Sequence, residues 1–275
     1  MPIEMATSSP SSAPAPAPAS QPALGAPRAA LPFAVCTLVP AYQASKTLAA
    51  VVHDLRREIP EASAGARILV IDDGSTDGTG ALAHELGCTV IAHGENRGKG
   101  AALRSGLATA RALGYAAALS VDADGQHPAG SARQVLYASR DPEALVLGVR
   151  DLEGAGAPRK NQVSNRISNF FLSLFAGQPL ADTQCGLRRY PVLRTLALAG
   201  RAPGYAYESE LLLRAVEARL PLVETRVPVL YPPGELRVTH FDSVRDPARI
   251  VVSVLSTLHD LSRARARRGP RGTAR

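Results

Sequence analysis

Short apolar runs alternate with longer segments in which apolar residues recur every three or four positions. The short runs predict buried strands at 34–39, 67–71, 88–92, 115–121, 144–149 and 221–230. The periodic segments predict helices at 45–59, 76–86, 101–113, 128–139, 162–175, 207–219 and 246–263. Strands that alternate with helices of about ten to fifteen residues indicate an α/β fold with a doubly wound, mainly parallel sheet.

Both ends of the chain depart from this pattern. Residues 1–30 are rich in Ala, Pro and Ser, and we expect them to form a disordered leader because they offer little apolar surface to bury. A single folded domain is expected over 31–241. An amphipathic helix at 242–262 and an Arg-rich disordered tail at 263–275 would follow it.

The positive charge of the chain lies mostly in this tail. Residues 262–275 contain six Arg and no acidic residue, so removing them lowers the net charge from +7 to +1. The body is therefore nearly neutral, and the composition does not indicate a nucleic-acid-binding face.

The three cysteines indicate a reducing compartment. Cys36, Cys88 and Cys185 are far apart, odd in number and without metal-binding spacing. The N-terminus lacks the features of a secretory signal. No apolar run reaches the roughly 20 residues that span a bilayer. We therefore expect a cytoplasmic protein.

Two carboxylates follow the predicted strand at 115–121. They belong to Asp122 and Asp124, and Gln126 and His127 come directly after them. In an open parallel sheet, ligands bind just beyond the carboxyl ends of the strands. Oxygen-rich side chains at such a place suit Mg²⁺ or Mn²⁺ bridged to phosphate oxygens. The hypothesis is a metal–diphosphate site, although the Asp-x-Asp pattern taken alone is better explained as a polar turn.

A second acidic motif follows the strand at 67–71. Asp72 and Asp73 precede Gly-Ser-Thr and Asp77, a run that also suits turn and helix-capping chemistry. Both interpretations can hold together. We assign Asp72 to ligand binding and Asp73 or Asp77 to the turn.

The segment 96–100, Asn-Arg-Gly-Lys-Gly, lacks the spacing of a nucleotide-binding P-loop. One interpretation is the start of a helix, where the glycines permit a tight turn, and the other is a segment that lies near a nucleotide. In the second case, Lys99 would be available to phosphate.

In order and spacing, these motifs resemble those of family 2 glycosyltransferases. The matching segments are Val39-Pro40-Ala41-Tyr42, then 70–79, 96–100 and 122–128. The branch that the chain most resembles is the polyprenyl-phosphate (dolichyl-phosphate) mannosyl- and glucosyltransferases. The likeness covers about 35–190 and continues more weakly to about 241.

This resemblance implies a GT-A fold, a nucleotide-diphospho-sugar donor and inverting transfer. The residues that it assigns to the nucleoside pocket are Pro40, Tyr42 and Asp72. It places Asp122 beside the ribose and diphosphate, and assigns the divalent metal to Asp124 and Gln126.

The resemblance also implies an acceptor side. The segment 183–188, Thr-Gln-Cys-Gly-Leu-Arg, resembles a Ser-Gly-Phe-Arg motif and places Asp182, Gln184 and Arg188 near the acceptor. Arg150 and Arg166 resemble arginines that grip an acceptor phosphate. The alternative for these arginines is a solvated surface. Cys and Leu replace the Ser and Phe of the motif, which leaves the identity of the acceptor open.

The chemistry depends on that acceptor. A phosphate is already anionic and needs basic anchors, whereas a hydroxyl needs a base, for which Asp182 is the candidate. A helix or turn cap is an equally good interpretation of Asp182.

Two segments are consistent with contact at a membrane. The Phe-rich helix at 165–175 and the final helix at 246–263 could lie on a bilayer or pack on the core. The Arg-rich tail would add attraction to anionic lipid of about 1 kcal/mol per well-placed charge.

The predicted function is transfer of a sugar from GDP-mannose or a UDP-hexose to a polyprenyl phosphate or another lipid-linked acceptor. A nucleotidyltransferase is an alternative, but it should carry a Gly-rich basic motif where this chain has Pro40, Ala41 and Tyr42. A non-catalytic sugar-nucleotide-binding protein is another, but the metal ligands and Arg188 argue for an active enzyme. A peripheral membrane contact is compatible with the prediction, and a nucleic-acid partner is not expected.

Overall fold

The computed structural model describes residues 30–230, 252, 254–260 and 263. At its centre is a seven-stranded sheet with the order β3-β2-β1-β4-β6-β5-β7. The strands are β1 (Val35–Ala41), β2 (Ile68–Asp72), β3 (Thr89–Ala92), β4 (Ala117–Ser120), β5 (Leu145–Arg150), β6 (Arg188–Pro191) and β7 (Leu222–Val227). All neighbouring strands are parallel except β6, which runs antiparallel to β4 and β5. The predicted doubly wound, mainly parallel sheet is confirmed.

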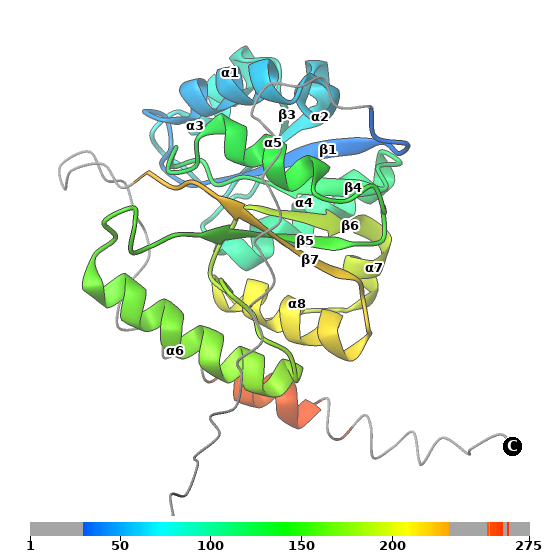
Figure 1. Cartoon of the computed structure of the whole chain (residues 1–275). Coiled ribbons are helices and arrows are strands. Elements are labelled where there is room, and N and C mark those ends of the chain that lie inside the picture. The colour runs from blue at the N-terminus through cyan, green and yellow to red at the C-terminus, as the bar shows by residue number, and fades with distance from the viewer. Residues whose placement is uncertain (1–29, 231–251, 253, 261–262, 264–275) are drawn as a thin grey trace, which may run out of the picture.

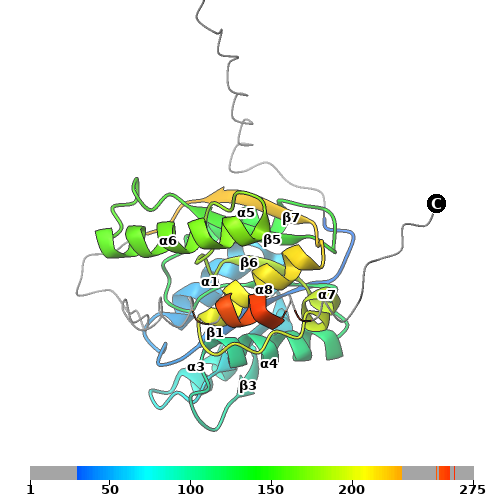
Figure 2. The ribbon, with the colours of Figure 1, turned by 90° about the horizontal axis from the view of Figure 1, so that it is seen from below.

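Helices cover both faces of the sheet (Figure 1, Figure 2). They are α1 (Leu48–Glu58), α2 (Pro60–Ser63), α3 (Thr79–Glu85), α4 (Lys99–Ala112), α5 (Ala129–Tyr137), α6 (Arg159–Ala176), α7 (Val192–Ala197) and α8 (Ala206–Glu217), with a 3₁₀ turn at Gly65–Arg67. Helices α1, α3 and α5 share one core cluster, and α4, α7 and α8 share the other. Because both faces are covered, the central strands are apolar on both sides, and this is why they stand out in the sequence.

Besides the 3₁₀ turn, the sequence analysis missed α2, β6 and α7. Strand β6 reads Arg-Arg-Tyr-Pro, which has no apolar run, yet all four residues are buried. Its position between β4 and β5 supplies the burial that its composition does not indicate.

The carboxyl ends of β2, β1 and β4 lie next to one another at one edge. Strand β1 is central and pairs with β2 on one side and β4 on the other. The chain changes direction across the sheet at β1, which is where ligands bind in folds of this kind. The motifs after these three strands therefore meet.

The Phe-rich helix, α6, has a largely exposed apolar face and buries only Asn165, Ser168 and Leu172 fully. Residues 252, 254–260 and 263 are helical and include the buried Val254. The predictions for 1–29, for most of 242–262 and for 264–275 lie outside the described residues. In the part of the chain that is described, no helix has both the length and the apolarity needed to cross a bilayer.

Candidate active site

The loops after β1 and β2 are bound together at this edge. The backbone N–H groups of Gln43, Ala44 and Ser45 donate to Ser75, Thr79 and Asp77 respectively. Burial opposes ionisation of Asp77, but hydrogen bonds from Thr79 and Ser45 outweigh it and lower the pKa of this carboxyl. This supports the assignment of Asp77 to the turn.

Asp72 and Asp73 have different hydrogen-bond partners. Asp73 is buried, lies 2.6 Å from Nδ1 of His93, and accepts the backbone N–H groups of Arg97 at 3.0 Å and Gly98 at 2.7 Å. It therefore holds the 96–98 segment in place. Among the described residues, the Asp72 carboxylate accepts one hydrogen bond, from the backbone N–H of Ser75, while its backbone carbonyl accepts from His93. The Asp72 carboxylate is thus better placed than that of Asp73 to take a ligand.

Pro40 and Tyr42 lie at the end of β1, beside Asp72. Pro40 is within the strand and pairs with Ile71, while Ala41 pairs with Asp72. Pro40 and Tyr42 are each partly exposed. The three residues assigned to the nucleoside pocket are thus neighbours at one edge of the sheet.

Lys99 starts α4 and faces Asp122. Its Nζ is 2.6 Å from Asp122 Oδ1 and 3.2 Å from Glu208 Oε2, and it lies 5.6 Å from the centre of the Tyr205 ring. Burial alone would lower the pKa of Lys99, but the carboxylates of Asp122 and Glu208 raise it above its usual value. The ammonium group is therefore charged, and its place beside Asp122 fits the nucleotide-facing interpretation of the 96–100 segment.

Gly186 brings backbone against this ion pair. A Cβ at position 186 would lie 2.4 Å from Asp122 Oδ2 and 2.5 Å from Lys99 Nζ. Only a residue without a side chain leaves the pair undisturbed. Gly186 thus allows the 183–188 segment to approach Asp122 and Lys99 closely.

Asp124 and His127 form the part of the site with spare hydrogen-bonding capacity. Burial, and then the charge of Asp122, raise the pKa of Asp124 to about 6. Burial lowers the pKa of His127 to about 4, so its imidazole is neutral at pH 7, and its Nδ1 is buried with no hydrogen-bond partner among the described residues. An acid destabilised by a like charge and an unpaired imidazole nitrogen are both features that a cation would relieve.

These side chains could hold a divalent cation only together with further ligand atoms. Among the described residues, no three His, Cys, Asp or Glu side chains gather closely enough to hold a metal by themselves. Gln126 is partly buried beside Asp124, and its backbone N–H donates to Asp124 Oδ1 at 2.9 Å. Its side-chain oxygen and the phosphate oxygens of a ligand would have to complete the shell.

Asp182 and Arg150 form an ion pair in which both carboxylate oxygens accept hydrogen bonds. The guanidinium of Arg150 binds both oxygens of Asp182, at 2.7 and 3.0 Å, and the Arg150 backbone N–H donates to the same carboxylate at 3.1 Å. Asp182 is 1% exposed. Burial would raise the pKa of Asp182, but Arg150 overcomes this and lowers it. A carboxylate held in this way is a weak base, so the geometry favours an orienting role for Asp182 over proton abstraction.

Arg150 lies close enough to the acidic site to affect it. Its charge contributes to lowering the pKa of Asp122 and of His127, after the larger effects of burial and nearer groups. The structure therefore brings together Lys99, Asp122, Asp124 and Arg150.

The segment 181–184 is attached to α6. Asn169 donates to the Ala181 carbonyl and accepts from the Thr183 N–H, and Ser168 pairs with the Thr183 hydroxyl. The Gln184 amide donates to the Ser164 hydroxyl at 3.3 Å. Gln184 thus links the acceptor-side segment to this helix.

Arg188, by contrast, does not reach the site surface. It is 1% exposed, and its three guanidinium nitrogens donate to the carbonyls of Cys185, Glu208 and Thr183. Its contacts are those of a structural residue that shapes the 183–188 segment. The assignment of Arg188 to the acceptor side stays a prediction, and its guanidinium is held by backbone carbonyls.

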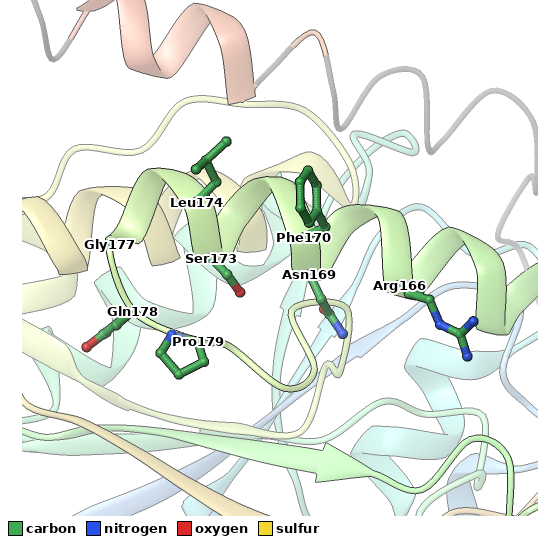
Figure 3. Close-up of a pocket in the computed structure, with 8 residues that line it drawn as sticks. All are labelled: Arg166, Asn169, Phe170, Ser173, Leu174, Gly177, Gln178 and Pro179. Atoms are coloured by element: carbon green, nitrogen blue, oxygen red, sulfur yellow. The ribbon is translucent and has the colours of Figure 1, made fainter. Parts of the chain in front are cut away.

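Arg166 lies in the second turn of α6 and lines the same hollow as Asn169 and Ser173 (Figure 3). It is about 75% exposed and forms an exposed ion pair with Glu153 at 2.8 Å. No contact in the described structure joins it to the acidic site, so its assignment to an acceptor phosphate stays a prediction.

Two residues at the site were not assigned by the sequence analysis, Glu208 and Gly186. Glu208 lies on an amphipathic helix, where an acid is expected to face solvent, and only the packing of α8 against Lys99 reveals it. Gly186 lies inside the recognised 183–188 motif, so its position was a usable signal.

Known proteins resemble this chain in sequence and in structure. Residues 36–192 match the family described as Glycosyl transferase family 2. Glycosyltransferase AglJ of Haloferax volcanii is 34% identical over 78% of this chain and 69% of its own length. Polyprenol monophosphomannose synthase of Mycolicibacterium smegmatis is 29% identical over 74% and 78%.

A solved structure shares the fold. Glucosyl-3-phosphoglycerate synthase of Mycobacterium tuberculosis, in complex with Mn²⁺, UDP-glucose and phosphoglyceric acid, superposes with a TM-score of 0.65 at 19% identity. The match covers 82% of this chain and 80% of that one. The GT-A architecture expected from the sequence is confirmed.

Proposed function

Because this chain belongs to glycosyltransferase family 2, we propose that it moves a sugar, with inversion, from a nucleotide-diphospho-sugar to a polyprenyl phosphate or another lipid-linked acceptor. The observation that carries the proposal is the proximity of four charged side chains. A charged lysine, Lys99, and two partly buried carboxylates, Asp122 and Asp124, lie within electrostatic reach of an oriented arginine, Arg150.

On the donor side, Pro40, Tyr42 and Asp72 line the nucleoside pocket and Asp122 lies by the ribose and diphosphate. Asp124 and Gln126 would hold Mg²⁺ or Mn²⁺, with Nδ1 of His127 as a further available ligand atom. When bound, such an ion neutralises charge that develops on the departing diphosphate. Lys99 contributes a second positive charge to the same side.

On the acceptor side, Arg150 binds the phosphate and Asp182 keeps its guanidinium in position. An acceptor phosphate oxygen forms the new bond to the anomeric carbon while the bond from that carbon to the diphosphate breaks. Because the phosphate is already anionic, no general base is needed. This agrees with the lowered pKa of Asp182.

The named relatives support the lipid-linked acceptor. They include a polyprenol monophosphomannose synthase and an undecaprenyl-phosphate mannosyltransferase from Micrococcus luteus. The glucosyl-3-phosphoglycerate synthase, by contrast, is described with a small soluble acid. We assign this chain to the lipid branch and place it at the cytoplasmic face of a membrane.

Calorimetry of donor binding tests the proposal. GDP-mannose, UDP-glucose and UDP-N-acetylglucosamine are titrated into the full chain, once with Mn²⁺ and once with EDTA. We expect one donor to bind only with metal. Transfer is then measured from that donor to a short-chain polyprenyl phosphate and to a matched polyprenol. Transfer to the alcohol but not the phosphate would overturn the acceptor assignment, and no donor binding by the folded protein would overturn the function.

A further inference from the structure

Helix α6 has a continuous apolar face that the described protein leaves open. Its exposed large apolar side chains are Val163, Ile167, Phe170, Phe171, Leu174 and Phe175. Their spacing of four, seven, eight, eleven and twelve residues after the first places them on one stripe of a helix. Phe170 and Leu174 are 65% and 64% exposed. Contiguous exposed apolar patches of this kind mark interaction surfaces.

The two faces of α6 have different chemistry. Figure 3 shows Phe170 and Leu174 pointing to one side of the helix and Asn169 and Ser173 to the other. The polar side is the one that holds the acceptor segment, since Asn169 bonds Ala181 and Ser173 bonds Leu180. Phe170 and Leu174 make none of these hydrogen bonds and are the most exposed of the apolar side chains on α6.

A second helical segment extends the apolar surface. Val254 packs in the same core cluster as Leu172 of α6. On the exposed side of that segment, Val252 and Leu255 are 66% and 57% exposed. Large apolar groups are thus presented by two neighbouring helices.

Basic residues border this surface. Arg159 and Lys160 are exposed at the start of α6, and Arg166 is exposed in its second turn. The sequence after residue 262 adds six Arg and no acid. An apolar helix face flanked by arginine and lysine matches the headgroup–acyl boundary of an anionic bilayer.

We propose that the exposed apolar face of α6, together with Val252 and Leu255, is a membrane-docking surface for anionic lipid bilayers. Docking holds the Arg150 side of the site at the level of the headgroups, where the phosphate of a lipid-linked acceptor lies. That second part rests on the proposed function, whereas the docking itself does not.

Charge favours a bilayer over a second copy of the chain as the occupant. Two copies that met through α6 would bring the basic residues at the start of this helix, Arg159 and Lys160, into one interface, and like charges across an interface oppose association. An anionic bilayer instead neutralises the same charges.

Vesicle flotation with the full chain tests the proposal. The vesicles are phosphatidylcholine alone and phosphatidylcholine mixed with phosphatidylglycerol. We expect binding to the mixed vesicles, weakened by salt. The double variant Phe170→Ser/Leu174→Ser should weaken it about a hundredfold, because each buried side chain contributes about tenfold. The matched control is Leu113→Ser/Leu193→Ser, which changes side chains that are 54% and 61% exposed elsewhere and should bind like the wild type.

Three outcomes would overturn the docking surface. They are no flotation of the folded wild type, equal flotation of the α6 variant, and a concentration-dependent dimer in light scattering that the α6 variant abolishes. Circular dichroism and donor binding establish that the variants are folded.

Transfer assays separate this inference from the proposed function. We expect the α6 variant to lose transfer to vesicle-embedded polyprenyl phosphate and to keep transfer to a short-chain phosphate in solution. Loss of both by a folded variant would contradict a docking role. If the wild type floats but transfers to neither acceptor, the proposed function fails and the docking surface stands.

Discussion

Two carboxylates, the partly buried Asp122 and the buried Asp182, are each paired with a cation, but their surroundings differ. Asp122 shares Lys99 with Glu208, and it lies near a second acid, Asp124, whose pKa is raised. Asp182 accepts two guanidinium and two backbone hydrogen bonds and has its pKa lowered. One side has excess negative charge that a further cation would relieve, while the other is already satisfied.

This difference separates ligand binding from positioning. Where the protein destabilises the ionised form of an acid, a cation that binds beside it relieves that destabilisation, so the acid favours cation binding. A buried acid whose oxygens are all bonded instead fixes its partner's geometry. We therefore expect changes on the Asp122–Asp124 side to affect chemistry first, and changes at Asp182 to affect stability first.

The largest effect is expected for Asp124→Asn. It keeps the shape of the side chain and removes the charge that a metal ligand needs, so transfer should fall about a thousandfold with the fold intact. Steady-state rates at saturating Mn²⁺, with thermal melting alongside, measure this. Asp54→Asn, an exposed acid on α1, is the control and should change nothing. Retention of full activity by both Asp124→Asn and Asp122→Asn would disprove the metal-site assignment.

The next largest effect is expected for Asp182→Ala. It removes the carboxylate that pairs with the Arg150 guanidinium, which is about 14% exposed, and the free energy of unfolding should fall by about 3 to 5 kcal/mol. Urea unfolding measures the loss, and Asp182→Ala/Arg150→Met should recover part of it. A variant with unchanged stability but no activity would instead identify Asp182 as the base.

The same pair has a pH signature. Because the pKa of Asp182 is lower in the folded protein, its stabilisation is present above the ordinary Asp value and is lost as pH falls through the folded value. Asp182→Ala should therefore flatten the acid side of the stability profile. An unchanged acid limb would argue against the ion pair as its source.

A smaller effect is expected for Gly186→Ala. The new methyl group would meet Asp122 and Lys99, so donor affinity should fall about tenfold as the pair shifts. Gly94→Ala is the control, because a Cβ there meets nothing within 4 Å. Calorimetric donor binding compares the two. Equal affinities would mean that the ion pair adapts freely to the added group.

Much of the part of the site that follows β1, β2 and β4, where the proposed donor binds, could be predicted from the sequence. Its strands are covered on both faces and read as apolar runs; Asp72 is the last residue of β2, and Asp122 follows β4 by two residues. Adjacent parallel strands end at one edge, so local motifs were enough to bring the acids together. The acceptor half has an antiparallel strand of buried arginines, which no hydrophobic pattern indicates.

The sequence by itself determined the fold class, the family and the acids at the strand ends, because strand periodicity and short motifs are local properties. Only the tertiary structure decided where the arginines point. Arg188 and Arg189 are adjacent, yet Arg188 binds the Glu208 carbonyl and Arg189 the Leu136 carbonyl, 20 and 53 residues away in sequence. It also decided that the apolar face of α6 is exposed. Burial of a long side chain depends on what distant segments bring to it, and the order of residues alone does not contain that information.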